Sequence, residues 1–257
     1  MNASIKSSQR TLELFELFSL EQRPLTIKEI TEALGMPQSS TSVLAKSLVS
    51  LGYLEKNEMR RTYYPTLRIS LLGTWIRRQH QRAGQLPALL SEVARVTGES
   101  TILAMRNGIY SQYLIAQKGN SPTRAQVESG MLYPLACCST GWCLLTLESK
   151  EAVSKIVRRT ISEAKNEHWR KSAKHAVEQV ELTQNRGYAF SKGETMERLG
   201  AISILLPSMP GAYAMSAGCG GWVDRVEGKK DLILGALNEL AHSVRQLKDQ
   251  DEQILFS

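Results

Sequence analysis

The chain has 257 residues, which is enough for one or two domains with an ample core. It carries 32 Lys and Arg against 25 Asp and Glu, a formal net charge of +7. No apolar run of about eighteen residues and no apolar signal segment near MNASIKSSQR occurs, so the sequence predicts neither a membrane span nor secretion. The four cysteines follow no disulfide framework, and we therefore expect a reduced, cytoplasmic compartment.

The positive charge is concentrated at the start of the chain. Residues 1–82 hold 12 Lys and Arg against 7 Asp and Glu (+5), whereas residues 83–257 hold 20 against 18 (+2). A basic balance placed in this way is typical of proteins that contact nucleic-acid phosphates. The first expected element is a helix from Ser8 to Leu20, with Leu12, Phe15 and Phe18 facing the core.

A second helix is expected to begin at Thr26. Thr26 and Glu29 have the spacing of a capping box, in which each side chain bonds the backbone of the other residue. Leu25 and Ile30 sit at the positions of a hydrophobic staple, and Gly35 can adopt the left-handed conformation that ends a helix.

A third helix, beginning near Pro37 to Ser39, separates two faces. The residues predicted to face the core are Thr41, Leu44, Ala45, Leu48 and Leu51. The residues left facing outward are Gln38, Ser39, Ser40, Ser42, Val43, Lys46 and Ser47. Small hydroxyls, one amide and one lysine suit a helix that lies in a DNA groove, because they donate and accept hydrogen bonds without bulk.

A basic hairpin follows this helix. A strand begins at Tyr53 after Gly52, residues 57–61 form a tip with Arg60 and Arg61, and 62–64 return. Helix, turn, helix and hairpin form a winged helix-turn-helix, whose second helix would read the major groove while the wing touches the backbone. The candidate DNA-binding residues are therefore Thr26, Gln38, Ser39, Ser40, Ser42, Val43, Lys46, Ser47, Arg60 and Arg61. The alternative is an ordinary helical hairpin within a larger core.

A connecting helix is predicted from Leu67 to about Gln79. Ile69, Leu72 and Ile76 recur along one face with Leu71 and Trp75 beside them. This is more apolar surface than a connector needs, so we expect a dimer seam as well as a linker. The basic stretch at residues 77–82 is the candidate domain boundary.

Helices and strands alternate through the remaining chain. The expected helices are 86–97 closed by Gly98, 139–148, a helix capped by Ser149, 167–186 and 227–248. The expected strands are 100–106 and 109–117 around an Asn107-Gly108 turn, then 123–128, 188–191, 200–206 and 212–217. This order favours an α+β or α/β sensor-like domain.

The residues do not indicate an enzyme or a metal site. No phosphate-binding glycine loop occurs, and Gly218-Cys219-Gly220-Gly221 lacks the third glycine of a dinucleotide fingerprint. We therefore expect Cys219 to be a buried structural residue rather than a nucleophile. His168, His175 and Glu178 lie on one predicted helix, which is typical of a solvated face rather than a metal site. We therefore expect no catalytic residue, no metal and no cofactor.

A ligand site is expected where the 139–148 helix begins. Amides and hydroxyls at Ser139, Thr140 and Gly141 would cradle an anion, or Ser139 would simply cap the helix. The candidate ligand-binding residues are Tyr133, Cys137, Ser139, Thr140, Gly141, Trp142, Glu194, Ala217 and Cys219, with Leu135 nearby. This composition favours a small carboxylate that carries a ring or short chain.

Three stretches carry a resemblance to a known family. They are the winged-helix stretch Leu25–Tyr64, GMLYPLACCSTGWCLL beginning at Gly130, and RGYAFSKGE beginning at Arg186 with the strand after it. The chain resembles the IclR family of bacterial transcription regulators over about nine-tenths of its length. The resemblance implies a homodimeric or homotetrameric DNA-binding regulator, repressor or activator, with a GAF-like C-terminal domain that binds a metabolite.

The expected fold is α+β. An N-terminal winged helix-turn-helix domain (1–66) is followed by a linker helix (67–82) and a C-terminal α/β effector-binding and oligomerisation domain (83–257). The expected function is effector-modulated, sequence-specific binding of double-stranded DNA. The alternative is a small-acid-processing enzyme or sensor with a protein-docking winged-helix module. Salt distinguishes them, because DNA binding weakens steeply as salt rises.

Overall fold

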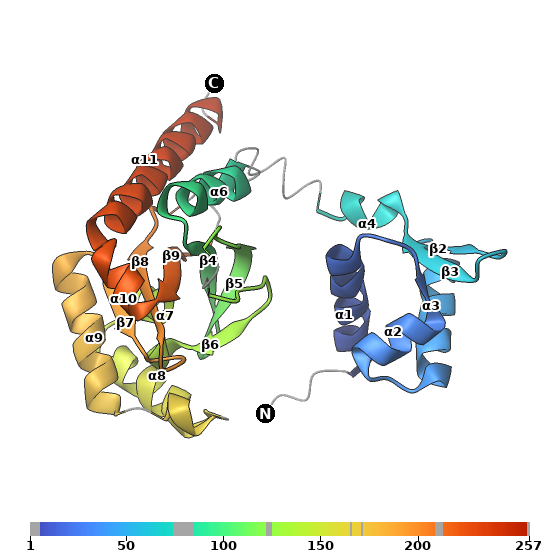
Figure 1. The fold of residues 1–257 in the computed structure, drawn as a ribbon, viewed down its shortest axis with the longest axis horizontal. Helices are drawn as coiled ribbons and strands as arrows, with labels where there is room; N and C mark the ends of the chain where they lie inside the picture. The colour runs from blue at the N-terminus through green and yellow to red at the C-terminus, as the bar shows by residue number, and fades with distance from the viewer. Residues whose placement is uncertain are drawn as a thin grey trace. The chain divides into compact units, whose positions relative to one another are not determined.

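The computed structural model describes residues 6–73, 85–121, 125–164, 166–170, 172–208 and 213–255 (Figure 1). The chain divides into two compact units, Met1–Gln81 and Arg82–Ser257. Among the helices in these ranges, none is long and apolar enough to cross a membrane.

The first unit is a small helical domain with a three-stranded antiparallel sheet of order β1-β3-β2. Its elements are α1 (Lys6–Glu21), β1 (Leu25–Thr26), α2 (Ile27–Leu34), α3 (Gln38–Ser50), β2 (Leu54–Asn57), β3 (Thr62–Pro65) and α4 (Leu67–Leu71). The predicted winged helix-turn-helix is confirmed. The predicted helix to Gln79 is described only as far as α4, and Trp75, Ile76 and residues 77–82 lie outside the described residues.

Local sequence fixes the helix ends as expected. The Thr26 hydroxyl accepts from the Glu29 backbone N–H, and the Glu29 carboxylate accepts from the Thr26 backbone N–H at 2.7 Å, so the capping box is confirmed. Gly35 ends α2 with a φ of 60°, a conformation in which a Cβ is strained. The short connection that follows brings α3 directly across α2.

The core of the first unit corrects two predictions. Its buried side chains are Leu14, Phe18, Leu25, Ile30, Ala45, Leu48, Leu54 and Tyr63. Leu12 is instead 65% exposed, because the buried stripe of α1 runs through Leu14 and Phe18. Leu51 is 55% exposed because it lies at the C-cap, where the regular turn of α3 has ended.

The second unit is built on a six-stranded antiparallel sheet of order β6-β5-β4-β9-β8-β7. Its strands are β4 (Ser100–Asn107), β5 (Tyr110–Gln117), β6 (Leu132–Pro134), β7 (Ala189–Lys192), β8 (Leu199–Leu205) and β9 (Met215–Trp222). Its helices are α6 (Leu86–Thr97), η2 (Leu135–Cys137), α7 (Ser139–Leu145), α8 (Lys150–Ser162), η3 (Glu167–Trp169), α9 (Ala173–Arg186), α10 (Val223–Gly228) and α11 (Lys230–Leu255).

Two helical layers cover this sheet (Figure 1). α6 and α11 pack on one face through Leu90, Ile233 and Leu237, which meet Ile202 and Ala217 of the sheet. The other layer contains α7, α8 and α9, whose buried side chains form a second cluster. α7 is buried over its whole length, so its N-terminal end lies inside the unit.

Several strand and helix bounds differ from expectation. Asn107 pairs with Tyr110, so the hairpin turn is Gly108–Ile109 rather than Asn107-Gly108. Residues 125–128 form no strand, while β6 was not foreseen. The expected 167–186 helix is interrupted, because Ser172 caps α9 separately from η3.

The C-terminal elements need similar corrections. The expected strand 212–217 is β9, which begins at Met215 and runs five residues further. The expected 227–248 helix is α11, and a separate α10 precedes it. Leu232 is half-exposed, because the buried stripe of α11 runs through Ile233 and Leu237.

Candidate functional site

The exposed face of α3 is the first candidate site. Thr41, Ala45 and Leu48 are buried on the opposite side, which fixes the rotation of the helix about its axis. Of the predicted DNA-contacting residues on α3, five are exposed and two are half-buried: Gln38, Ser39, Val43, Lys46 and Ser47, and then Ser40 and Ser42. α3 carries no Asp or Glu, so its outward face has no charge that repels phosphate.

The wing lies at the tip of the β2–β3 hairpin. The Arg60 backbone N–H donates to Asn57 Oδ1 at 3.0 Å, and Arg61 adopts a φ of 51°, which closes the tip. Both arginines are exposed and form no ion pair with another described residue. Lys56 is paired with Glu58 at 2.6 Å. The tip thus presents two uncompensated guanidinium groups, which bind phosphate well.

Thr26 is placed apart from the α3 face. It lies at the start of α2, and its hydroxyl both accepts from Glu29 and donates to the Glu29 carboxylate at 2.8 Å. The hydroxyl is therefore already engaged in the cap.

The second candidate site surrounds the start of α7. Ser139 Oγ lies 2.7 Å from Ser203 Oγ on β8, and Thr140 Oγ1 lies 2.8 Å from Ser111 Oγ on β5. All four residues are buried. The capping alternative for Ser139 is wrong, because Cys138 occupies the N-cap position and no side chain caps the helix. Two pairs of hydroxyls therefore join α7 to the sheet.

Gly141 and Trp142 hold α7 against η2. A Cβ on Gly141 would lie 2.3 Å from the Leu135 carbonyl oxygen, so only glycine permits this approach. Trp142 is fully buried, and its Nε1 donates to the Ala136 carbonyl at 2.9 Å. Both residues therefore shape the site by packing, and the Trp142 indole N–H is already bonded within the protein.

An aromatic row lies beside the hydroxyl pairs. The Tyr133 ring is 5.2 Å from Tyr113 and 6.0 Å from Trp169. Burial raises the pKa of both tyrosines and that of Cys138. Cys137 Sγ donates to the Trp169 carbonyl at 2.9 Å. Tyr133 and Cys137 are thus brought together, through a tryptophan that the sequence had not indicated.

Glu194 lies in the β7–β8 loop, which two histidines contact. Its Oε1 is 3.0 Å from His175 Nε2, and the Gly193 carbonyl is 3.0 Å from His168 Nε2. The predicted single helix face is wrong, because His168 lies on η3 and His175 on α9. Both histidines contact this loop, while the His175 side chain stays 39% exposed. Among the residues described, no group of three or more His, Cys, Asp or Glu is arranged to hold a metal ion.

Ala217 and Cys219 are not brought together with Ser139 and Thr140. Side chains of a strand alternate between faces, and these two point toward α6 and α11. Gly218 lies between them, and a Cβ there would meet Ser203 Oγ at 2.5 Å and Thr140 at 3.3 Å. Burial raises the pKa of Cys219 to about 12, so its thiol is protonated at neutral pH.

Some residues of this site escaped the sequence reasoning. Ser203 interrupts an otherwise apolar strand, which was the available signal for a buried hydroxyl. Ser111 gave no such signal, because it stands beside Gln112 in β5. Trp169 had no such signal, because its position depends on the break before α9.

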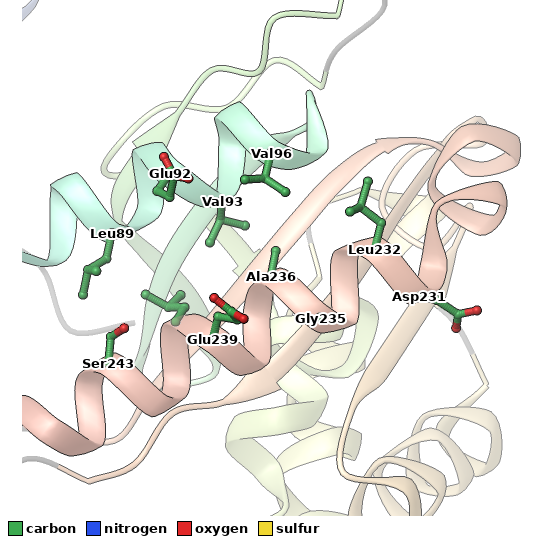
Figure 2. Close-up of a pocket in the computed structure, with 11 residues that line it drawn as sticks. Leu89, Glu92, Val93, Val96, Asp231, Leu232, Gly235, Ala236, Glu239 and Ser243 are labelled. Atoms are coloured by element: carbon green, nitrogen blue, oxygen red, sulfur yellow. The ribbon is translucent and has the colours of Figure 1, made fainter.

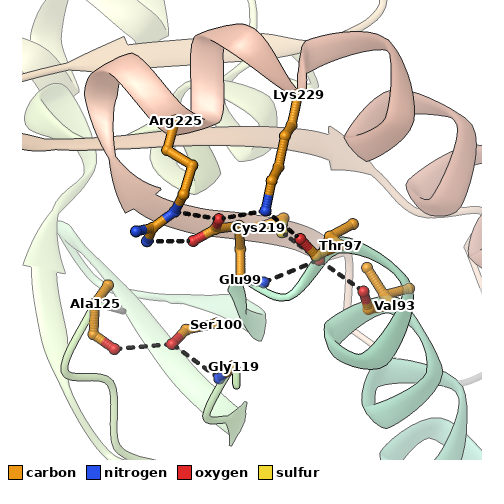
Figure 3. Close-up of polar contacts among 9 residues, drawn as sticks. All are labelled: Val93, Thr97, Glu99, Ser100, Gly119, Ala125, Cys219, Arg225 and Lys229. Carbon is orange, nitrogen blue, oxygen red and sulfur yellow. Dashed lines mark hydrogen bonds and ion pairs between the residues drawn. The ribbon is translucent and has the colours of Figure 1, made fainter. Parts of the chain in front are cut away.

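A buried ion cluster joins the opposite layer to the sheet (Figure 3). Glu99, fully buried, accepts from Arg225 at 2.7 Å and from Lys229 at 3.1 Å. Lys229 also donates to the Thr97 carbonyl, and Thr97 Oγ1 lies 3.4 Å from Cys219 Sγ. These contacts connect the end of α6 to α10 and α11.

A groove of about 460 Å³ runs between α6 and α11 (Figure 2). Val93, Val96 and Ala236 are among the apolar residues that line it, while Glu92 and Glu239 place carboxylates along it. It lies on the layer opposite α7 and includes none of the predicted ligand-binding residues.

Comparisons with known proteins place both units in one family. A family model described as IclR helix-turn-helix domain matches residues 7–58, and one described as Bacterial transcriptional regulator IclR C-terminal matches residues 80–246. The probable transcriptional regulator SauR of Cupriavidus necator is 23% identical over 93% of this chain and 94% of its own. The glycerol operon regulatory protein of Streptomyces coelicolor is 23% identical over 95% and 96%.

Solved structures share the fold. An IclR transcriptional regulator from Alicyclobacillus acidocaldarius superposes with a TM-score of 0.69 at 19% identity, covering 95% of this chain and 99% of that one. An IclR homolog from Microbacterium hydrocarbonoxydans, complexed with 4-hydroxybenzoate, gives a TM-score of 0.60 at 14% identity, covering 91% and 98%.

Proposed function

The chain belongs to the IclR family of bacterial transcriptional regulators, and from this premise we propose that the α3 face reads a specific duplex DNA sequence. It is a regulator with a helix-turn-helix DNA-binding domain and an effector domain, not an enzyme. The observation that carries the reading role is the exposed α3 face, which has hydroxyls, one lysine and no carboxylate opposite a buried stripe. Arg60 and Arg61 of the wing would bind the flanking backbone.

Selection from a random duplex pool tests this proposal. The protein should enrich one sequence, and its affinity should fall steeply between about 50 and 200 mM salt because phosphate contacts release counterions. Failure to enrich any duplex sequence would contradict the α3 reading role. A duplex affinity that does not change with salt would contradict phosphate contacts and favour the alternative, in which the winged-helix module docks a protein.

We further propose that the effector is a small carboxylate bound beside the start of α7. Two features support this: the hydroxyls of Ser139 and Thr140, and the aromatic row of Tyr113, Tyr133 and Trp169. A bound carboxylate would exchange the hydroxyl–hydroxyl bonds for bonds to its own oxygens, which are stronger acceptors. The 4-hydroxybenzoate of the Microbacterium homolog is a ring-bearing carboxylate of this class.

Calorimetry with 4-hydroxybenzoate and a series of small carboxylates tests the ligand proposal. Thr140→Val keeps the shape of the side chain but removes its hydroxyl, and Ser139→Ala removes the other. Both should weaken ligand binding while DNA binding by the free protein is retained. Glu92→Gln, in the groove of the opposite layer, is the matched control. Unchanged ligand affinity in both site variants would contradict the proposed site.

We also propose a homodimer or homotetramer in which residues 67–82 link domains 1–66 and 83–257. Leu67, Leu71 and Leu72 support this, because they are 76%, 59% and 53% exposed at the end of the first unit. Three such leucines in six residues form an apolar patch that suits burial against a second copy.

A further inference from the structure

A hollow of about 420 Å³ lies in the first unit between the N-terminal part of α1 and the exposed face of α3. α1 contributes Ser7 and Arg10, and α3 contributes Val43 and Ser47 among others. The same α3 side chains belong to the proposed DNA-reading face. Whatever approaches that face therefore also approaches Arg10.

Arg10 occupies an unusual position on its helix. Residues four apart lie on one side of a helix, and Arg10 is followed at that spacing by Leu14 and Phe18, which are both buried. Arg10 therefore lies on the core-facing side of α1, one turn before the first buried residue of that side. It is half-buried and forms no ion pair with any described residue. Core packing does not account for this cation, whereas an anion entering the hollow would.

The charges of the residues that line this hollow favour an anion there. The side chains that line it include one arginine and no carboxylate. A second hollow of the same unit, of about 370 Å³, contains Glu21, Glu29 and Glu32. Its one arginine, Arg23, is paired with Glu21 at 2.9 Å and with Glu29 at 2.7 Å. An anion is therefore attracted to the first hollow and repelled from the second.

The remaining lining suits a sugar–phosphate backbone. Met36 and Leu44 provide apolar surface, and Ser7, Ser39 and Ser40 provide hydroxyls. A DNA strand presents deoxyribose carbons next to phosphate oxygens, so it needs both kinds of surface at once. Hydroxyls and guanidinium groups are common donors to phosphate oxygens.

We propose that this hollow is a second DNA contact, in which Arg10 binds a backbone phosphate when α3 lies in the major groove. The inference rests on the proposed reading role of α3 and adds a positioning residue outside the helix-turn-helix itself. Arg10 would fix how far α3 enters the groove without reading a base, because phosphate contacts carry no sequence information directly.

Salt titration of DNA affinity tests the proposal. Each phosphate contact contributes about 0.9 to the slope of log affinity against log salt. For each protomer bound to the duplex selected by the wild type, Arg10→Gln and Arg10→Met should each reduce the magnitude of that slope by about 0.9, which is about 1.8 for a dimer on two half-sites. Arg10→Lys keeps the charge and should retain the slope. Arg23→Gln removes the same charge from the carboxylate-lined hollow and should leave the slope unchanged.

The outcomes separate this inference from the function on which it rests. An unchanged slope in Arg10→Gln and Arg10→Met, with normal melting temperatures, overturns the Arg10 contact and leaves the α3 reading role intact. A changed preference at one base in a repeated selection also overturns it, because Arg10 would then read a base. A wild type that selects no duplex overturns both proposals.

Discussion

Val43 is the most informative single residue of the reading face. Its side chain is 68% exposed on α3, where an apolar group is useful chiefly against a thymine methyl. Val43→Ser should cost about 1 kcal/mol of binding at one operator position and leave the melting temperature nearly unchanged. Affinities for duplexes substituted at single positions measure this. A melting temperature lowered by several degrees would show that Val43 supports the core.

Gly221 tests the buried ion cluster. A Cβ at this position would lie 2.2 Å from Glu99 Oε2 and 2.9 Å from the Arg225 guanidinium. Gly221→Ala should therefore lower the free energy of unfolding by about 3 kcal/mol, since it overpacks the site and displaces a paired buried charge. Urea unfolding measures the change.

Gly235→Ala is the matched control for that experiment. A Cβ on Gly235 meets nothing within 4 Å, and the residue lies within α11. Alanine is the better helix former by about 1 kcal/mol, so this variant should be equal or more stable. Equal losses in both variants would mean that crowding around Glu99 is not the cause.

At the scale of elements, the capping box of α2 gives the first unit a pH dependence. The Thr26 backbone N–H, followed by Arg23 and the Thr26 hydroxyl, lowers the pKa of Glu29 to about 2. A carboxyl whose folded pKa is depressed contributes stability above its unfolded pKa of about 4.3. That contribution is lost as the pH falls from there toward the folded value.

Glu29→Gln should therefore destabilise the protein at neutral pH and flatten the fall in stability below about pH 4.3. The effect should be modest, because the Glu29 side chain is 39% exposed and solvent screens its charge. Urea unfolding at several pH values measures it. Glu32→Gln, outside the capping box, should keep the wild-type pH profile, and an identical profile for both variants would contradict the assignment to Glu29.

How far the sequence predicted each element depended on the distance between the groups that decide it. The α2 cap and the Gly35 end were predictable, because every atom involved lies within ten residues. The sequence could not predict whether Cys219 or Gly218 is the neighbour of Thr140, because the register of β9 against β4 and β8 decides which of them faces α7. A shift of one residue exchanges the two faces of a strand.

The same distinction applies to the candidate sites. The exposed side of α3 followed from helical periodicity alone, whereas Leu12 was misplaced because α1 offers apolar residues on more than one side. The partners of Ser139 and Thr140 come from β8 and β5, more than twenty residues away in either direction. No local pattern predicts such partners, although Ser203 within the apolar strand β8 was visible.

At the scale of the whole molecule, the leucines of α4 make the assembly testable. A Leu71→Asp, Leu72→Asp double variant places two charges in the exposed apolar patch and should shift the proposed dimer toward monomer in sedimentation equilibrium. Operator affinity should fall with it, because a monomer holds one half-site. Leu147→Asp changes a similarly exposed leucine of the second unit and is the control. A dimer equally stable in the double variant would contradict a seam at α4.

The position of β9 between β4 and β8 has a consequence for how the protein is made. The first unit closes its sheet at β3, early in the chain, so it can fold while the ribosome is still translating the second. β4 is synthesised with β5, but its other edge stays unpaired until β9, the last strand described, has been made. Glu99 likewise has no partner until Arg225 and Lys229 have been made. Throughout that interval the nascent chain displays an open strand edge and an unneutralised carboxylate. It is this stretch of the nascent chain that chaperones would need to shield from aggregation.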